Sequence, residues 1–112
     1  MGKIEIENFD NYKVFNLSGQ FTGGPETDEF YDEMVKVDSE KLNLIVNFDG
    51  CNYLSSIAIG ILVKMHAKFS ESNLKLIFCG FNQTLENVLK MTKVLTILNV
   101  EADLEAAKKK ML

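Results

Sequence analysis

The chain has 112 residues, a length that suits one ordinary domain with a real core and is too short for two. Apolar residues make up 46% of it and charged residues 25%, as in soluble globular proteins, and no apolar run reaches the roughly 20 residues that a membrane span needs. We therefore predict one domain over residues 1–112 without a membrane segment. The net charge of −4 argues against non-specific nucleic-acid binding, which usually needs a basic surface.

The N-terminal residues and the cysteines indicate the cellular compartment and the kinds of site to expect. Residues 1–5 alternate charged and apolar side chains and lack the apolar core of a signal peptide, so we expect a cytoplasmic protein. Cys51 and Cys79 have neither CxxC spacing nor a histidine cluster, which predicts two small buried side chains and no metal, cofactor or disulfide. All 12 basic residues are Lys, so no arginine is available to clamp a phosphate.

The first third of the chain reads as two strands and a helix. Residues 3–7 and 12–18 alternate polar and apolar side chains around an Asp-Asn turn, which predicts a hairpin. A Gly-Gly-Pro sequence then breaks the pattern, and Pro25 suits the first turn of a helix. From Glu26 to Val37 apolar residues recur at helical spacing between acidic ones, which predicts an amphipathic helix.

The remainder alternates apolar strands with helical patterns. Residues 42–48 and 74–79 are short, branched and nearly continuously apolar, as in strands that are covered on both faces. Asp49-Gly50 reads as a turn. Helical spacing of apolar residues predicts helices over 57–72, 85–92 and 103–111, with 95–100 as a short extended segment.

The order of these elements defines the fold class. Strand, strand, helix and then three strand–helix pairs require crossover connections between parallel strands. We therefore predict an α/β fold, with a mixed sheet of about four to five strands and about four helices packed against it. The sequence contains no repeat and no low-complexity segment.

A serine pair at the junction of an apolar strand and an apolar helix is the most informative local feature. The first N–H groups of a helix lack intrahelical partners, and the helix dipole makes that end partly positive. The hydroxyls of Ser55 and Ser56 are therefore suited either to capping the helix or to accepting a phosphate. Of the two, Ser55 is the better candidate for a structural cap.

The element order, the segment from Asn47 to Gly60 and the apolar pattern from Leu85 to Leu98 resemble the STAS domain family, especially bacterial anti-sigma-factor antagonists. In that family the phosphorylated serine lies in an Asp-Ser-Ser-Gly-Leu-Gly or Ile-Ser-Ser-Ala-Gly-Leu stretch, which places the acceptor on Ser56. This chain departs from the family pattern at three positions: Ser55 replaces the preceding acid, Ala58 the first glycine, and Thr22 an acid after the second strand.

The resemblance implies a switch in transcription regulation, with no catalytic residue. An unphosphorylated antagonist binds an anti-sigma factor that is also a serine kinase, and phosphorylation ends the binding. Carried to this chain, Ser56 is the phosphoacceptor, and the residues expected to contact the partner are Thr22, Asn47, Tyr53, Ser55, Ile57 and Ala58. Tyr53, Leu54 and Ile57 could form an exposed apolar rim beside the serines that contacts a partner, and packing in the core explains them equally well.

Three other interpretations stay open. A divergent member could bind a protein or small ligand constitutively, without phosphorylation, and Ser55 in the place of an acid favours this reading. A serine hydrolase would need His66 to activate Ser56, although no GxSxG motif is present. Asn47 and Asp49 could orient the Ser56 loop or hold a metal that a kinase brings with its nucleotide.

Overall fold

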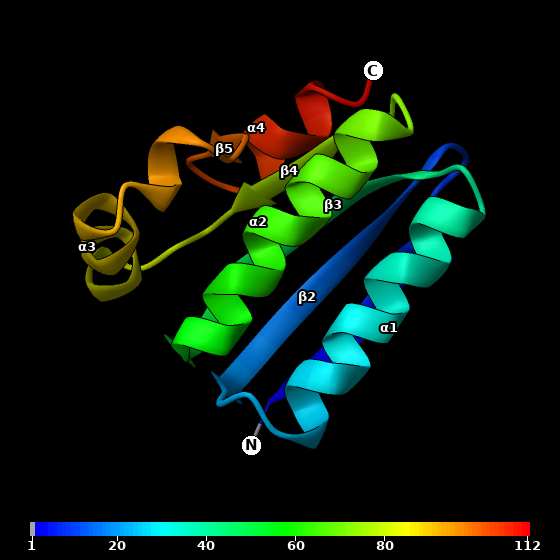
Figure 1. The fold of residues 1–112 in the computed structure, drawn as a ribbon. Helices are drawn as coiled ribbons and strands as arrows, with labels where there is room; N and C mark the ends of the chain where they lie inside the picture. Colours follow the sequence, from blue (N-terminus) through cyan, green and yellow to red (C-terminus); the bar gives the residue numbers. More distant parts are fainter. Residues whose placement is uncertain (1) are drawn as a thin grey trace.

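The computed structural model describes residues 2–112, which form five strands and four α-helices. Figure 1 shows the elements in place. The strands are β1 (Lys3–Asn8), β2 (Tyr12–Phe21), β3 (Asn43–Leu54), β4 (Leu76–Cys79) and β5 (Val100–Glu101). The helices are α1 (Pro25–Ser39), α2 (Ser56–Glu71), α3 (Gln83–Met91) and α4 (Leu104–Lys109), with a 3-10 turn at Val94–Thr96.

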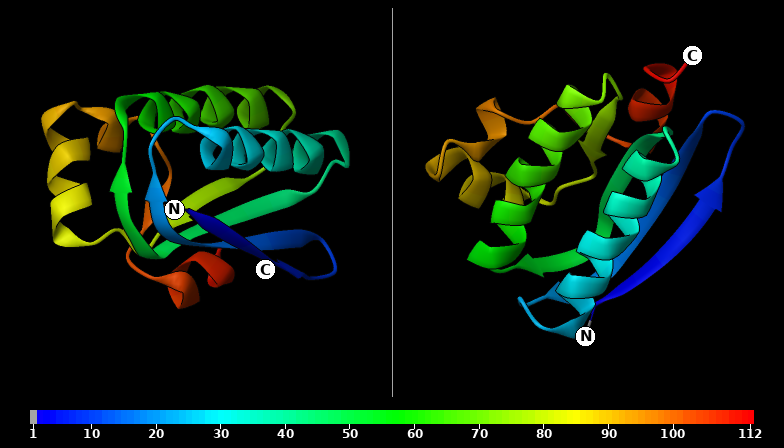
Figure 2. Two further views of the ribbon diagram at one scale, coloured as in Figure 1. Left: turned by 90° about the horizontal axis from the view of Figure 1, so that it is seen from below. Right: turned by 45° about the vertical axis from the view of Figure 1, so that its right-hand side comes forward.

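The strands form one mixed sheet in the order β1-β2-β3-β4-β5. β1 and β2 are antiparallel and joined by a short hairpin, whereas the other three pairs are parallel. Parallel neighbours need crossovers, which α1, α2 and α3 supply. These observations confirm the predicted α/β fold. The left-hand view of Figure 2 shows the sheet beneath the long helices α1 and α2.

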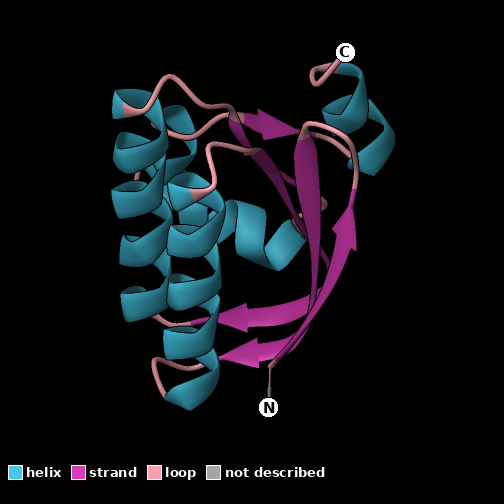
Figure 3. Cartoon of the chain, turned by 90° about the vertical axis from the view of Figure 1, so that its right-hand side faces the viewer, coloured by secondary structure: helices cyan, strands magenta, loops and turns pink. Residues whose placement is uncertain are grey.

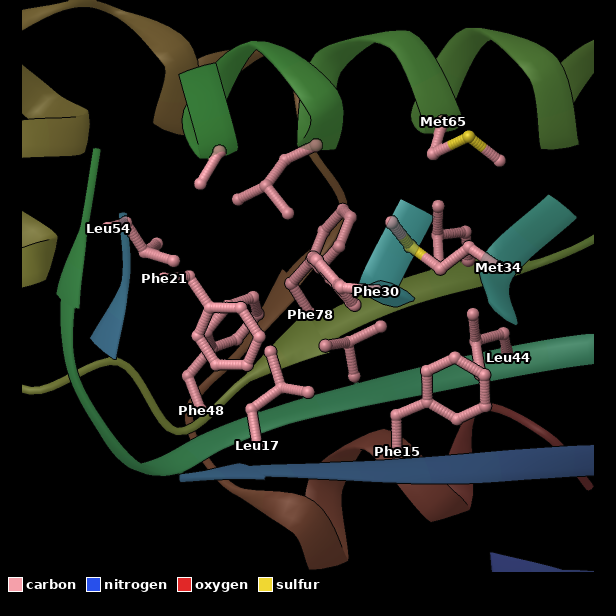
Figure 4. Packing of buried hydrophobic residues seen from close by; sticks show 14 of the residues in the cluster. Phe15, Leu17, Phe21, Phe30, Met34, Leu44, Phe48, Leu54, Met65 and Phe78 are labelled. Atoms are coloured by element: carbon pink, nitrogen blue, oxygen red, sulfur yellow. The ribbon is translucent and has the colours of Figure 1, made fainter. Parts of the chain in front are cut away.

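The two faces of the sheet are covered unequally, as Figure 3 shows: α1 and α2 lie on one side and the short α4 on the other. Side chains of a strand alternate between faces, so β3 sends Leu44 and Val46 toward α1 and α2, and Ile45 toward α4. The core on the α1–α2 side is large and aromatic. Figure 4 shows its members between sheet and helices: Phe15, Leu17, Phe21, Phe30, Met34, Leu44, Phe48, Leu54, Met65 and Phe78.

The cluster under α4 is smaller. It consists of Val14, Ile45, Ile77, Cys79, Ala107 and Met111. Cys79 thus packs under α4, while Cys51 packs in the larger core, and both are free and buried, which confirms the prediction of two small buried side chains. No helix within residues 2–112 is long and apolar enough to cross a membrane.

Two predicted segments differ in the structure. Asp49-Gly50 was expected to be a turn, but β3 runs through it to Leu54 and stays paired with β2, whose register shifts twice along this stretch. These irregularities bend the strands without ending them. The second difference is the segment 95–100. It begins in a 3-10 turn after Lys93, which has a left-handed backbone (φ 63°), and only Val100–Glu101 is extended.

Candidate functional site

Ser55 caps helix α2. Its Oγ accepts a hydrogen bond from the backbone N–H of Ala58 at 3.1 Å, and its own N–H donates to the carbonyl of Phe21 at 2.8 Å. The first bond satisfies one of the N–H groups that a helix start leaves free, and the second fixes α2 to the end of β2. Ser55 is therefore the structural cap that the sequence predicted.

Ser56 is the first residue of α2 and has a different environment. Its side chain is exposed, and its hydroxyl makes no hydrogen bond with any group of residues 2–112. The first turn of α2 contains no acidic residue. The N–H groups of Ser56 and Ile57 begin the helix without an intrahelical acceptor. An anion on Ser56 would meet the positive end of the helix dipole and no carboxylate from the first turn of its own helix.

The loop of residues 22–24 lies against the start of α2. A Cβ atom at Gly23 would approach Ile57 Cδ1 to 3.1 Å and Ser55 Oγ to 3.5 Å, so the backbone of Gly23 packs closely against these two side chains. Gly23 has a φ of +95°, a left-handed conformation that favours glycine. In Figure 1 this loop and the start of α2 lie at the same end of the molecule, where β2 and β3 end.

A carboxylate holds this loop in place. Glu26 Oε1 accepts hydrogen bonds from the backbone N–H of Thr22 at 2.7 Å and from Thr22 Oγ1 at 2.6 Å, and Gly23 N–H donates to Thr27 Oγ1 at 2.9 Å. The hydrogen bonds from the side chain and backbone of Thr22 lower the pKa of Glu26 from 4.5 to about 2. Sequence reasoning missed Glu26 because a Thr and a Glu four positions apart do not match the capping-box spacing of three.

Apolar side chains border the serines, although fewer than expected. Tyr53 is 48% exposed and Ile57 is 61% exposed, so both are available to a partner. Leu54 is only 5% exposed and Ala58 is fully buried, so both belong to the core. Leu54 therefore follows the core-packing alternative, and the expectation that the Ala58 side chain contacts a partner was wrong. The cause is the direction of the two side chains: Leu54 at the end of β3 and Ala58 on the inner face of α2 both point into the core between the sheet and the helices.

We call the resulting area the Ser56 surface. It consists of Thr22, Gly23, Tyr53, Ser55, Ser56 and Ile57. Thr22 is exposed and belongs to it by chain continuity with Gly23, but its hydroxyl is already committed to Glu26. The surface thus combines a constrained loop, two exposed apolar side chains and one uncommitted hydroxyl.

Asn47 does not belong to this surface. Its Nδ2 donates to Asn16 Oδ1 at 2.9 Å, and its Oδ1 accepts from the N–H of Asp49 at 3.2 Å. Asn47 and Asp49 line a pocket of about 500 Å³ together with Gly80 and Asp103. This pocket contains no residue of the Ser56 surface. The structure thus does not bring Asn47 together with the Ser56 surface, because its position in β3 places its side chain on the α4 face. Asp49 lines the same pocket and makes no hydrogen bond with the Ser56 loop among the described residues.

The hydrolase interpretation also fails on geometry. Ser56 and His66 lie on the same helix, ten positions apart, which corresponds to a rise of about 15 Å. A general base must lie within hydrogen-bond reach of its nucleophile. His66 therefore cannot activate Ser56.

The next features are candidate metal ligands and the two cysteine thiols. Residues 2–112 contain no group of three or more His, Cys, Asp or Glu side chains placed to hold a metal ion. Burial raises the pKa of the Cys51 thiol, and burial together with Asp103 raises that of Cys79 to about 12. Both thiols are held in their unreactive form.

These observations describe an α/β module with an exposed serine at the start of its second helix. Comparison with known families gives the class: the family model of the STAS domain matches residues 3–107, nearly the whole chain. The chain belongs to the STAS domain family. A comparison with curated proteins found no match.

Solved structures share the fold at low sequence identity. An anti-sigma factor antagonist from Mycobacterium paratuberculosis is 14% identical, with a TM-score of 0.85 over 98% of this chain and 93% of its own. The anti-sigma factor antagonist SpoIIAA in its unphosphorylated form is 12% identical (TM-score 0.76; 97% and 96% covered). The Bacillus cell fate determinant SpoIIAA in its phosphorylated form is 13% identical (TM-score 0.74; 96% and 98% covered). At this identity the likeness establishes the fold alone.

Proposed function

We propose that this chain is an anti-sigma-factor-antagonist-like interaction module of the bacterial cytoplasm that binds a protein partner through the Ser56 surface. A serine kinase, which is also the anti-sigma factor in this proposal, ends that binding by phosphorylating Ser56. The observation that carries the proposal is the contrast between the neighbouring serines. Ser55 Oγ caps α2, whereas Ser56 is exposed with an uncommitted hydroxyl.

A phosphate on Ser56 would change the partner's side of the contact more than the chain's own fold. It adds about −1.5 to −2 charges at neutral pH. On this chain the charge lies at the start of α2, where the dipole favours it and no acid stands in the first turn. The charge would also lie beside Ile57, which is 61% exposed, so an apolar partner group at this position would have to desolvate the phosphate.

The structural relatives support the proposal. SpoIIAA, whose fold this chain shares, is an anti-sigma factor antagonist described in both an unphosphorylated and a phosphorylated form. A protein with the same architecture therefore carries a phosphate. The present chain has no arginine to pair with a phosphate, so the effect would come from repulsion and desolvation at the interface.

A constitutive binder is the second candidate function. Thr22 is held by Glu26, and Ser55 stands where the family has an acid, so neither residue supplies a carboxylate next to the acceptor. In this case the Ser56 surface binds its partner whatever the growth condition, and Ser56 is simply the first residue of a helix.

Mass spectrometry of the chain isolated from its own cells separates the two. Trypsin cuts after Lys41 and Lys64, so the serines lie on one peptide. We expect a phosphate on Ser56 in at least one growth condition, with Ser55 unmodified. An unmodified peptide in every condition, with complete coverage, would contradict the switch and favour constitutive binding. Chain carrying Ser56→Ala is the control for the site assignment.

A further inference from the structure

The outer edge of the sheet at β1 is unpaired. β1 is the first strand of the sheet and, within residues 2–112, pairs only with β2. Five of its six residues are exposed, and Ile4 is half-buried. The right-hand view of Figure 2 shows no helix or loop alongside its outer edge. Such an edge leaves a row of backbone N–H and C=O groups free to pair with another strand.

The side chains of β1 are sorted by charge on its two faces. Ile4 packs against the large core, and Ile6, 39% exposed, lines a groove beside α1, so both isoleucines lie on the α1 side. Lys3, Glu5 and Glu7 lie on the opposite face. None of these three makes an ion pair within residues 2–112.

We propose that a second copy of this chain pairs with β1, antiparallel and centred on Glu5, so that the two sheets join into one. A two-fold axis through Glu5 places Lys3 opposite the partner's Glu7, and the partner's Lys3 opposite Glu7. It also places Ile4 opposite the partner's Ile6, twice, on the α1 face. The arrangement forms two opposite-charge pairs and two apolar pairs, the cross-strand contacts that stabilise antiparallel sheets.

Other registers are poorer. In a continuous antiparallel sheet, directly opposite residues point to the same face. If the faces of the two sheets are to match, the two-fold axis must therefore pass beside one residue and its copy in the partner. Centring on Ile6 sets Glu5 against the partner's Glu7 twice and leaves Lys3 without a charged partner. Centring on Ile4 pairs only three residues of the strand. The charges that usually protect an edge strand from association thus select one register here. The one unfavourable contact is Glu5 against the partner's Glu5.

Charge reversal tests the proposal. Sedimentation velocity across a dilution series should show a monomer–dimer equilibrium for the wild-type chain. Lys3→Glu and Glu7→Lys should each weaken dimerisation by roughly tenfold, because each turns two attractive cross-strand pairs into repulsive ones. The double variant should restore wild-type affinity. Lys109→Glu, an exposed change of the same charge on α4, is the control and should leave the equilibrium unchanged.

Disulfide trapping tests the register directly. Glu5→Cys should form an inter-chain disulfide under mild oxidation, because directly opposite Cα atoms lie within the distance range of a disulfide. Glu7→Cys should not, since it faces the partner's Lys3, and the native cysteines are buried. A wild-type chain that stays monomeric overturns the proposal, as does a double variant that fails to recover or a Glu7→Cys that cross-links as readily. Circular dichroism shows that each variant is folded.

Discussion

Two helix starts lie side by side in this molecule, and they are built in opposite ways. Helix α1 begins after Gly24, which offers no side-chain cap, and brings its own negative charge in Glu26 and Asp28. Helix α2 begins after Ser55, which caps it with a neutral hydroxyl, and its first turn contains no acid. The first start has an anion built in, while the second leaves its dipole unmatched. Only the second therefore gains from an added phosphate.

The largest effect is expected from a substitution that adds a negative charge to the start of α2 and so makes it resemble the start of α1. Ser56→Asp should lower affinity for the partner by about a hundredfold, because a carboxylate would stand in the apolar contact area, and this corresponds to roughly 2.7 kcal/mol. Ser56→Ala should leave affinity unchanged, since the Ser56 hydroxyl makes no hydrogen bond with the part of the chain that the structure describes. Calorimetric titration with the partner captured on the Ser56→Ala chain measures both. Equal affinities for the two variants would contradict the switch.

The contact between the two starts depends on a residue without a side chain. Gly23→Ala should destabilise the fold by about 1–2 kcal/mol, because alanine is strained at positive φ. The new methyl also approaches Ile57. Gly60→Ala is the matched control: Gly60 is helical with open space around it, and this change should stabilise by about 0.5–1 kcal/mol. Urea denaturation should therefore shift in opposite directions for the two variants.

Removal of the neutral cap should have a moderate effect. Ser55→Ala should cost about 1 kcal/mol of unfolding free energy, because the N–H of Ala58 loses its acceptor. Ser56→Ala should stay within about 0.5 kcal/mol of wild type, as a surface change without a lost hydrogen bond. Thermal unfolding of the two variants compares them under the same conditions. A larger loss for Ser56→Ala would reverse the assigned roles.

The built-in anion of α1 should give a pH signature. The pKa of Glu26 is lowered to about 2 in the folded chain from 4.5, so its contribution to stability is fully present above about pH 5. As pH falls from there toward 2, the carboxylate becomes protonated first in the unfolded chain and the contribution disappears. The stability difference between wild type and Glu26→Gln should therefore shrink over this range, as denaturation at several pH values would show. Glu29→Gln, which removes the charge of an exposed acid on the same helix, is the matched control for the change in net charge.

The fold could be predicted from the sequence because its strands and helices carry clear periodic patterns. The alternation in β1 and β2 and the continuous apolar runs of β3 and β4 gave the mixed sheet. The end of β3 could not be predicted, because Asp49-Gly50 has turn composition although the strand continues. Pairing with an irregular β2 holds it extended, and that is a long-range effect.

The site was predictable in part for a similar reason. Ser55 and Ser56 follow from local helix-start chemistry, and the break in the strand pattern at Gly23 follows from the Gly-Gly-Pro sequence. Asn47 was misplaced because a strand buried on both faces does not reveal which face a polar residue takes. Glu26 was missed because its partner Thr22 lies outside the helix that it belongs to. The roles of residues that depend on their immediate sequence neighbours could be predicted. The roles of residues that depend on contacts with another secondary-structure element could not.

The unequal covering of the sheet has a consequence for its two thiols. Cys51 is shielded by the large core and Cys79 by the small cluster under α4, a helix of six residues. The short helix should open more often than the aromatic core. An alkylating reagent would then mark Cys79 first and Cys51 only on global unfolding. The labelling rates of the two native cysteines would thus report separately on the opening of the two sides of the sheet, and their order would show which side opens first.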